Sequence, residues 1–243
     1  MNKTQLTNFI TKYTLGGEIK STKWTSNGDS LSTRFISGDK SVVGKVVLSK
    51  FSHLSPCELG VYNTGQLSSL LSVLGDDIDI NLSQSGDKFI SMEFEDTKRK
   101  TKSKYMLSDL SVIPTPPALK NLPDSFELGI KVDPYFINTF TSGKSALAEA
   151  ETFTILTENG ETKIVIGYAS IASNRVTIPV ETTKNAEIEP ISFNANMFAS
   201  ILNANKDCES ATLEVSSAGL SRIQFAIDNY DSEYFLVSTQ AVN

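Results

Sequence analysis

The chain has 243 residues, of which 40% are hydrophobic and 21% charged, and its formal net charge at pH 7 is −6. This length allows two domains of ordinary size or one large β domain, and the composition is that of a soluble globular protein. The acidic balance argues against a protein that coats nucleic acid with a basic surface. There is no apolar run long enough to span a membrane, and the N-terminus lacks the apolar centre of a secretory signal. We therefore expect a cytoplasmic protein with no membrane partner.

Few residues in the sequence could bind a metal. The chain has one histidine and two cysteines, Cys57 and Cys208, which are far apart and belong to no C-x-x-C pair. We expect two buried thiols rather than a disulfide or a pair of ligands. The sequence therefore predicts no metal site and no cofactor.

Four segments are predicted to be helical, namely residues 3–13, 64–75, 134–146 and 194–206. In the second, four leucines from Leu67 to Leu74 follow the i, i+3, i+4, i+7 spacing of a single apolar stripe. Asn63 or Thr64 can cap its first turn. The third helix begins with Asp133 as a cap, followed by a first-turn proline.

The helix faces opposite the apolar stripes are polar but carry no acid. In the second helix that face has Ser68, Ser69 and Ser72, although serine is a mediocre helix former. None of the 28 acidic residues of the chain falls within the four helices, which do contain lysines. These lysines are Lys3, Lys12, Lys144 and Lys206. Such a surface suits a polyanion that moves past the helices without binding to them tightly. Helices packed against another protein layer would instead be apolar on both faces.

Strand-like runs with turn signals lie between the helices. The turns Asn27-Gly28 and Asn159-Gly160 are each flanked by such runs, which is the strongest short signal of a hairpin. The stretch "TKRKTKSK" is expected to form another hairpin tip. Its basic residues are Lys98, Arg99, Lys100, Lys102 and Lys104. This tip is either a solvated loop that discourages edge-to-edge pairing or a possible DNA contact loop.

The chain contains an internal repeat. Residues 62–95 align with residues 193–227, so that Leu67 matches Phe198 and Gly86 matches Gly219. Each half reads as helix, strands, helix, strands. We therefore expect an α+β fold with two similar domains, each with two helices on one side of antiparallel sheets.

The two halves meet in a proline-rich connector, residues 108–123. As an extended segment at about 3.1 Å per residue it could span about 50 Å. We therefore divide the chain into an N-terminal domain (1–107), the connector (108–123) and a C-terminal domain (124–243). The connector also contains a P-x-x-P pattern, but a stiff linker is favoured over a ligand for an SH3 domain.

Together these features resemble the DNA sliding clamps, or DNA polymerase processivity factors, and most closely those of tailed bacteriophages. The stretches that carry the resemblance are "VYNTGQLSSLLSVLGDDIDINLSQSGDKFISMEFED" and the terminal strand "SEYFLVSTQ". The resemblance implies a DNA clamp fold, with helices that line a ring around duplex DNA and sheets outside. With four helix-plus-strands units per chain, the ring closes as a homotrimer. The ending "STQAVN" departs from the acidic tail of the eukaryotic proliferating cell nuclear antigen.

The same resemblance implies partners and site residues. The partners are duplex DNA, bound without sequence specificity, a DNA polymerase and a clamp loader, in the host cytoplasm if the protein is viral. DNA-facing residues would be Lys3, Lys12, Ser68, Ser72, Lys144 and Lys206. A pocket for a partner peptide would use Val112, Ile113, Pro114, Phe235 and Val237. The subunit interface would pair one edge strand with Tyr105 and Leu107 against another with Val176 and Ile178. Pro179 fits an edge strand because it cannot donate to a central ladder.

Two other functions compete with a sliding clamp. For an enzyme, "TSGKS" has the ending of a phosphate-binding loop, but Asn138 stands where that motif needs a glycine. His53, the only histidine, has no neighbours that suggest a triad, so we expect no enzyme. A β-rich virion structural protein of a tail or capsid is the more serious alternative. The acid-free helices favour the clamp, since a shell or tube has no need of them.

Overall fold

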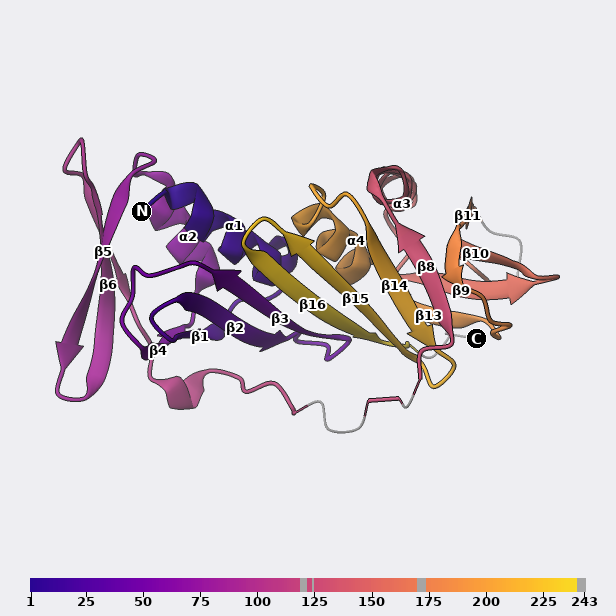
Figure 1. Cartoon of the computed structure of the whole chain (residues 1–243), viewed down its shortest axis with the longest axis horizontal. Coiled ribbons are helices and arrows are strands. Elements are labelled where there is room, and N and C mark those ends of the chain that lie inside the picture. Colours follow the sequence, from indigo (N-terminus) through magenta and orange to yellow (C-terminus); the bar gives the residue numbers. More distant parts are fainter. Residues whose placement is uncertain (119–121, 124, 170–173, 240–243) are drawn as a thin grey trace. The chain divides into compact units, whose positions relative to one another are not determined.

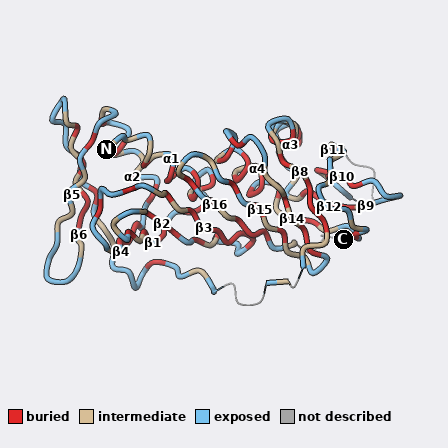
Figure 2. Tube along the Cα trace, viewed as in Figure 1, coloured by how far each residue is buried: buried red, intermediate tan, exposed pale blue. Residues whose placement is uncertain are grey.

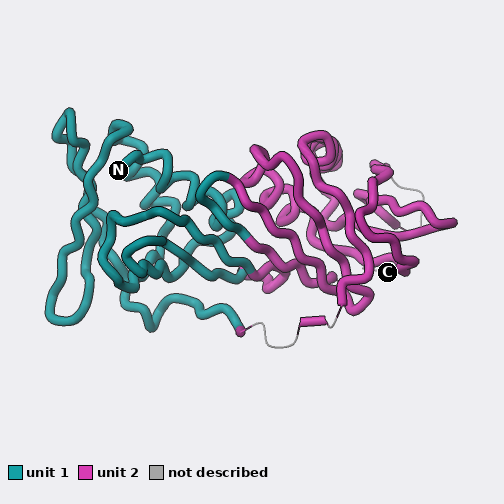
Figure 3. The backbone as a smooth tube through the Cα atoms, in the orientation of Figure 1, with its two compact units in different colours: residues 1–36, 44–117, 228–232 teal, residues 37–43, 118–227, 233–243 magenta. Residues whose placement is uncertain are grey.

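The chain folds into two compact units. The computed structural model describes residues 1–118, 122–123, 125–169 and 174–239. Unit 1 comprises residues 1–36, 44–117 and 228–232, and unit 2 comprises residues 37–43, 118–227 and 233–243 (Figure 3). Each unit therefore includes a short segment from the half of the sequence that forms most of the other unit.

Unit 1 follows the order helix, strands, helix, strands (Figure 1). Its elements are α1 (Lys3–Thr14), η1 (Leu15–Gly17), β1 (Thr22–Ser26), β2 (Ser30–Ile36), β3 (Val42–Ser49), β4 (Cys57–Val61), α2 (Thr64–Ser72), β5 (Ile78–Ser85), β6 (Lys88–Asp96), β7 (Lys102–Met106) and η2 (Leu110–Val112). The strands lie in the orders β4-β1-β2-β3 and β5-β6-β7. The first two residues of β3 belong to unit 2.

Unit 2 repeats this order after an initial strand, and the first three residues of its last strand belong to unit 1. Its elements are β8 (Leu128–Val132), α3 (Pro134–Ala146), β9 (Thr152–Glu158), β10 (Glu161–Ile166), β11 (Val176–Pro179), β12 (Thr182–Lys184), β13 (Ile191–Asn194), α4 (Ala195–Ala204), β14 (Ala211–Ser216), β15 (Leu220–Ile227) and β16 (Tyr230–Val237). The strands lie in the orders β12-β8-β14-β15-β16 and β11-β10-β9-β13. The expected α+β class, with two helices and antiparallel sheets in each half, is confirmed.

The helix caps predicted from the sequence are present. The side chain of Asn63 accepts a hydrogen bond from the amide of Gln66 at 3.0 Å, and Asp133 accepts one from Phe136 at 2.8 Å. Helix α4 also has a cap, Asn194, whose side chain accepts from the amide of Met197. Because each cap satisfies an amide that has no partner within the helix, these residues fix where the helices begin. Helix α2 ends at Ser72, three residues before the predicted end.

The predicted turns are also present. Asn159 and Gly160 both have positive φ, 55° and 79°, and form a two-residue loop between β9 and β10. That combination is typical of a type I′ hairpin. Gly86 and Gly219, which the repeat aligns, both have positive φ in the hairpins β5–β6 and β14–β15. The internal repeat is therefore present in the backbone as well as in the sequence.

Each unit has its own aromatic core. Figure 2 colours the buried residues of the chain red. In unit 1, the indole of Trp24 donates to the hydroxyl of Tyr13 at 3.2 Å, and that hydroxyl donates to Thr64 at 3.4 Å. This chain of hydrogen bonds joins β1, α1 and α2. Burial raises the pKa of Tyr13, so its hydroxyl stays protonated as a donor. In unit 2, the core rings are those of Phe136, Phe140, Phe153, Phe193 and Phe198.

The two cysteines differ in burial. Cys208 is buried, but Cys57 is only half-buried, so the expectation of two buried thiols is correct for one of them. None of the helices in the described part of the chain has the length and apolar character needed to span a bilayer.

Candidate nucleic-acid interface and docking grooves

The exposed faces of α1 and α2 are covered with hydroxyl groups. In α2, Ser69 and Ser72 are exposed and Ser68 is half-buried. The hydroxyl of Ser69 donates to the carbonyl of Gly65 at 3.0 Å, and that of Ser72 donates to the carbonyl of Ser69 at 2.7 Å. In α1, Thr11 donates in the same way to Thr7 at 2.9 Å. On these faces the hydroxyl groups therefore donate their hydrogen bonds to carbonyls of the same helix and present their oxygens outward.

Helices α3 and α4 have the same kind of face. The hydroxyl of Thr141 donates to the carbonyl of Ile137 at 2.8 Å, and Ser145 donates to Thr141 at 2.8 Å. The exposed positions of both helices are mostly amides and hydroxyls, among them Asn138, Ser142, Asn196 and Asn203. No acidic residue lies within α1, α2, α3 or α4, and the structure describes every residue of these helices.

Two of the four lysines expected to face DNA are buried. Lys12 is 6% exposed, and its ammonium lies over the ring of Tyr230, 5.3 Å from the centroid. Lys144 is 7% exposed and donates to the carbonyl of Ala148 at 2.8 Å. Burial and these internal contacts argue against both residues as DNA contacts.

The other two lysines lie at helix ends. Lys3 is half-buried, and its ammonium donates to the carbonyl of Leu74 at 2.5 Å. Lys206 is exposed and lies just beyond the C-terminal cap of α4. The helix faces are therefore closer to neutral than the sequence indicated, with hydroxyl and amide groups as their main feature.

The basic hairpin tip is neutralised by acids of its own sheet. Lys102 and Lys104 lie directly opposite Glu95 and Glu93 in the β6–β7 register. Their ammonium groups lie 3.0 and 2.8 Å from those carboxylates. These hydrogen bonds hold the pKa of both glutamates below the usual range.

The rest of the tip is also anchored. Lys98 pairs with Asp77 at 2.9 Å, and Lys100 pairs with Glu95 at 3.6 Å. Asp96 accepts the backbone amides of Lys98 and Arg99 at 2.9 and 2.8 Å. The tip therefore forms a charge-balanced turn, which weakens the case for a DNA contact loop.

Strands β7 and β11 are both edge strands, as expected. In β7, Leu107 donates to Ile90, so the backbone groups of Lys104 and Met106 point away from β6. In β11, Val180 donates to Thr162 at 3.4 Å, which directs the backbone groups of Thr177 and Pro179 toward the unpaired edge.

Side chains expected at the subunit interface differ in exposure. Tyr105 is 3% exposed and its hydroxyl accepts the amide of Asn63, and Ile178 is 4% exposed. Leu107 and Val176 are half-buried. These four side chains are buried or half-buried, and the unpaired edges present backbone groups together with exposed Met106 and Thr177.

The start of the connector is attached to β4 at Gly60. Ser108 donates to the carbonyl of Gly60 at 2.9 Å. A Cβ at Gly60 would lie 2.3 Å from the carbonyl oxygen of Ser108 and 3.4 Å from the side chain of Ile113. Only glycine allows this approach, which fixes the position of η2 on the sheet.

We expect Gly60→Ala to displace the connector. The added methyl group overlaps a carbonyl oxygen, so the free energy of unfolding should fall by about 1–3 kcal/mol and amides 108–113 should exchange faster. Chemical denaturation and hydrogen exchange measure the two effects. Gly65→Ala is the matched control, because its Cβ would meet nothing closer than 3.6 Å. Unchanged exchange at 108–113 would contradict this account.

Two grooves flank η2 within unit 1. The first, called here the connector groove, has a volume of about 300 Å³. It is lined by Lys23, Thr25, Ser32, Thr33, Arg34, Lys45, Leu110, Ile113, Pro114, Thr115 and Pro116. The second, called the hairpin groove, has a volume of about 350 Å³. It is lined by Glu58, Gly60, Asp87, Lys88, Phe89, Ile90, Leu107, Ser108, Asp109 and Leu110.

The residues expected to form a peptide pocket divide between the units. Ile113 and Pro114 line the connector groove, and Val112 is exposed beside it. Phe235 and Val237 belong to unit 2, where Phe235 is 3% exposed and Val237 is exposed. Residues of β1–β3 that line the connector groove were not expected. The outward lysines and arginine of these strands are the sequence signal that could have identified them.

The enzyme motifs do not form sites. The stretch "TSGKS" lies inside α3, and Gly143 and Lys144 are buried. His53 packs edge to face on Phe51, and burial lowers its pKa. No group of three or more histidine, cysteine or acidic residues able to hold a metal occurs among the described residues.

Comparisons with known proteins identify the fold. By sequence, no protein-family model and no curated protein match the chain. By structure, the chain is similar to the proliferating cellular nuclear antigen of Entamoeba histolytica, with a TM-score of 0.75 over 99% of this chain and 97% of that one. The chain has the sliding-clamp fold. The two sequences are only 13% identical, so the sliding-clamp fold is shared without close sequence similarity.

Proposed function

We propose that the chain is a subunit of a DNA sliding clamp, a ring that encircles duplex DNA and tethers a DNA polymerase for processive synthesis. The proposal is supported by the sliding-clamp fold together with the exposed helix faces. All four helices lack acidic residues, and their exposed faces are mainly hydroxyl and amide groups. A duplex surrounded by such faces meets few repulsive and few tightly binding groups. The protein acts as a scaffold and catalyses no reaction.

The proposed ring is a homotrimer. Strands β7 and β11 supply one unpaired edge each, so β7 of one subunit pairs with β11 of the next. The functional domains are residues 1–107 and 124–243, joined by the connector 108–123. The proposed partners are duplex DNA, the polymerase and a clamp loader, and the clamp is of the tailed-bacteriophage type, at work in the host cytoplasm.

Mass and shape together test the ring. We expect light scattering to give three times the mass of the chain, 26.5 kDa, and small-angle X-ray scattering to give a distance distribution with a central hollow. A compact monomer at all micromolar concentrations would argue against a closed ring. A trimer without a hollow would support a different assembly, as in a virion component.

A further inference from the structure

Three cations form a row across neighbouring strands of unit 1. Lys23 of β1 lies directly opposite Arg34 of β2 in the antiparallel register. Between β2 and β3, Ser37 donates to the carbonyl of Val42, and counting back along both strands from that pair places Lys45 opposite Arg34. Adjacent strands lie about 4.8 Å apart, so these three residues, called here the cation row, span about 10 Å.

The cation row lies on the face of the sheet that α1 does not cover. On the covered face, Trp24 donates to the hydroxyl of Tyr13 of α1, and the rings of Phe35 and Tyr13 lie 6.4 Å apart. Successive side chains of a strand point to opposite faces of a sheet. Lys23 and Arg34, which are next to Trp24 and Phe35 in sequence, therefore point away from the helix, and both are exposed.

The stability of the sheet does not account for the cation row. Like charges in directly opposed positions destabilise a sheet, and the row contains two such contacts between adjacent strands. It does so in a chain whose net charge is −6. An arrangement that costs stability at an exposed face indicates that the positive charge serves another purpose.

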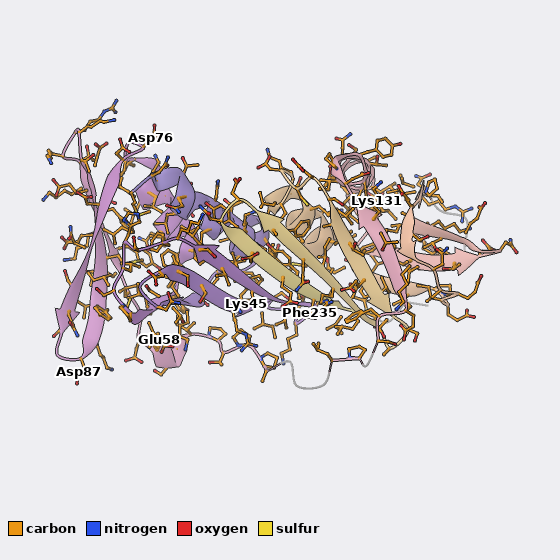
Figure 4. The ribbon with its side chains drawn as sticks, in the orientation of Figure 1. Lys45, Glu58, Asp76, Asp87, Lys131 and Phe235 are labelled. Carbon is orange, nitrogen blue, oxygen red and sulfur yellow. The ribbon has the colours of Figure 1, made fainter. Side chains whose placement is uncertain are left out.

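Part of this positive charge is available to a ligand. Lys23 pairs with Glu58 at 2.7 Å, and Arg34 donates one hydrogen bond to the carbonyl of Pro117 at 2.7 Å. The guanidinium of Arg34 retains further donors. Lys45 has no ion pair within the described ranges of the chain, and it is exposed. Figure 4 labels Lys45 and Glu58 in this part of unit 1.

The polar groups beside the cation row are hydroxyls. Thr25 and Ser32 lie directly opposite each other in the β1–β2 register, and both line the connector groove together with the row. Neither a carboxylate nor an aromatic ring lines this groove among the described residues. Proteins contact phosphates through lysine, arginine and hydroxyl side chains, whereas they hold unpaired bases by aromatic stacking. The lining therefore suits a phosphate backbone and does not distinguish its bases.

We propose that the cation row binds the phosphate backbone of single-stranded nucleic acid. One strand carries one negative charge per nucleotide at a regular repeat, which matches cations repeated at the strand spacing of a sheet. Arg34 offers paired donors to one phosphate, and Lys45 contacts its neighbour. The connector also lines this groove of about 300 Å³, which therefore admits one strand rather than the wider duplex.

This contact is additional to the proposed function. In the proposed clamp the helix faces surround duplex DNA, whereas the cation row lies on the sheet face away from α1. A strand bound to the row therefore lies outside the bore. Processive synthesis supplies such a strand, because the template ahead of a polymerase is single-stranded.

The binding of fluorescein-labelled oligothymidine to the full chain, measured by fluorescence anisotropy at low salt, tests the proposal. Lys45→Glu should lower the affinity about fivefold or more and reduce the slope of log affinity against log salt by about 0.7. Lys20→Glu is the matched control, because Lys20 is exposed, lies outside the groove and gives the same change of net charge. The affinities of Lys20→Glu and of Lys45→Arg should stay within about twofold of the parent.

A second comparison separates the cation row from the helix faces. Ser69→Glu with Ser72→Glu should leave the affinity for oligothymidine unchanged, and Lys45→Glu should leave loader-dependent retention of duplex DNA unchanged. Lys45→Glu replaces a like-charge contact with Arg34 by a contact of opposite charges, so its melting temperature should not fall. A chain that forms no ring but binds oligothymidine through Lys45 would contradict the proposed function alone.

Three outcomes would overturn the assignment of the cation row. The first is no binding of oligothymidine by the parent at low salt. The second is an equal loss of affinity in Lys45→Glu and Lys20→Glu, which would reflect net charge only. The third is a labelled polyglutamate peptide that binds more tightly than oligothymidine and depends on Lys45, which would assign the row to an acidic protein segment.

Discussion

Glutamates on the exposed face of α2 are expected to reduce retention on DNA by about tenfold or more. The variant is Ser69→Glu with Ser72→Glu, and Lys206→Glu strengthens the effect. At about 10 Å in water, one carboxylate and one phosphate repel by about 0.4 kcal/mol before screening. The proposed ring of three subunits would carry six such glutamates, so the repulsion totals about 2.4 kcal/mol before screening.

The measurement is loader-dependent retention on nicked circular DNA, followed by release when the circle is linearised. Gln84→Glu with Ser85→Glu is the matched control, because it adds the same charge at exposed positions of the β5–β6 hairpin. Light scattering first confirms that both variants keep the oligomeric state of the parent. Equal retention of the parent and the α2 variant at low salt would mean that the helices do not face DNA, and a virion structural role would then be favoured.

Thr177→Pro is expected to convert the proposed trimer to monomers. The amide of Thr177 points to the unpaired edge of β11, and Pro179, the next residue that faces this edge, has no amide to donate. The substitution therefore removes a donor available to a neighbouring subunit. It leaves the hydrogen bonds between β10 and β11 in place.

Light scattering across a concentration series measures the loss, and circular dichroism checks that the fold persists. Thr177→Ala is the control, because it retains the amide and removes only the side chain. A trimer of unchanged mass and stability in Thr177→Pro would show that other edges join the subunits.

Local signals account for what the sequence predicted well. Caps at Asn63 and Asp133 and the turn Asn159-Gly160 act within a few residues, and the backbone follows them. The acid-free helices were equally visible, because they depend only on where each helix begins and ends. The elements therefore follow from local patterns of the sequence, and the fold class follows from those elements together with the internal repeat.

Side-chain positions within the site depended on contacts that are distant in sequence. Lys12 is covered by Tyr230, and no local pattern indicates that contact. The ion pairs of the basic tip could have been found, because Glu93 and Glu95 mirror Lys104 and Lys102 across the turn. The connector groove depends on β1, β2 and β3, and no local pattern of the sequence indicates that these strands lie beside the connector.

The segment 228–232 of unit 1 has a consequence for how the protein is made. Asn229 accepts the amide of Ser49 at 2.8 Å, and the hydroxyl of Tyr230 donates to the carbonyl of Gln5 at 2.9 Å, across 225 positions of sequence. At about 5–20 residues per second, a ribosome takes roughly 10 to 45 s to add those residues. Unit 1 therefore lacks these contacts until translation is almost complete, and a nascent chain stopped at the connector cannot form them.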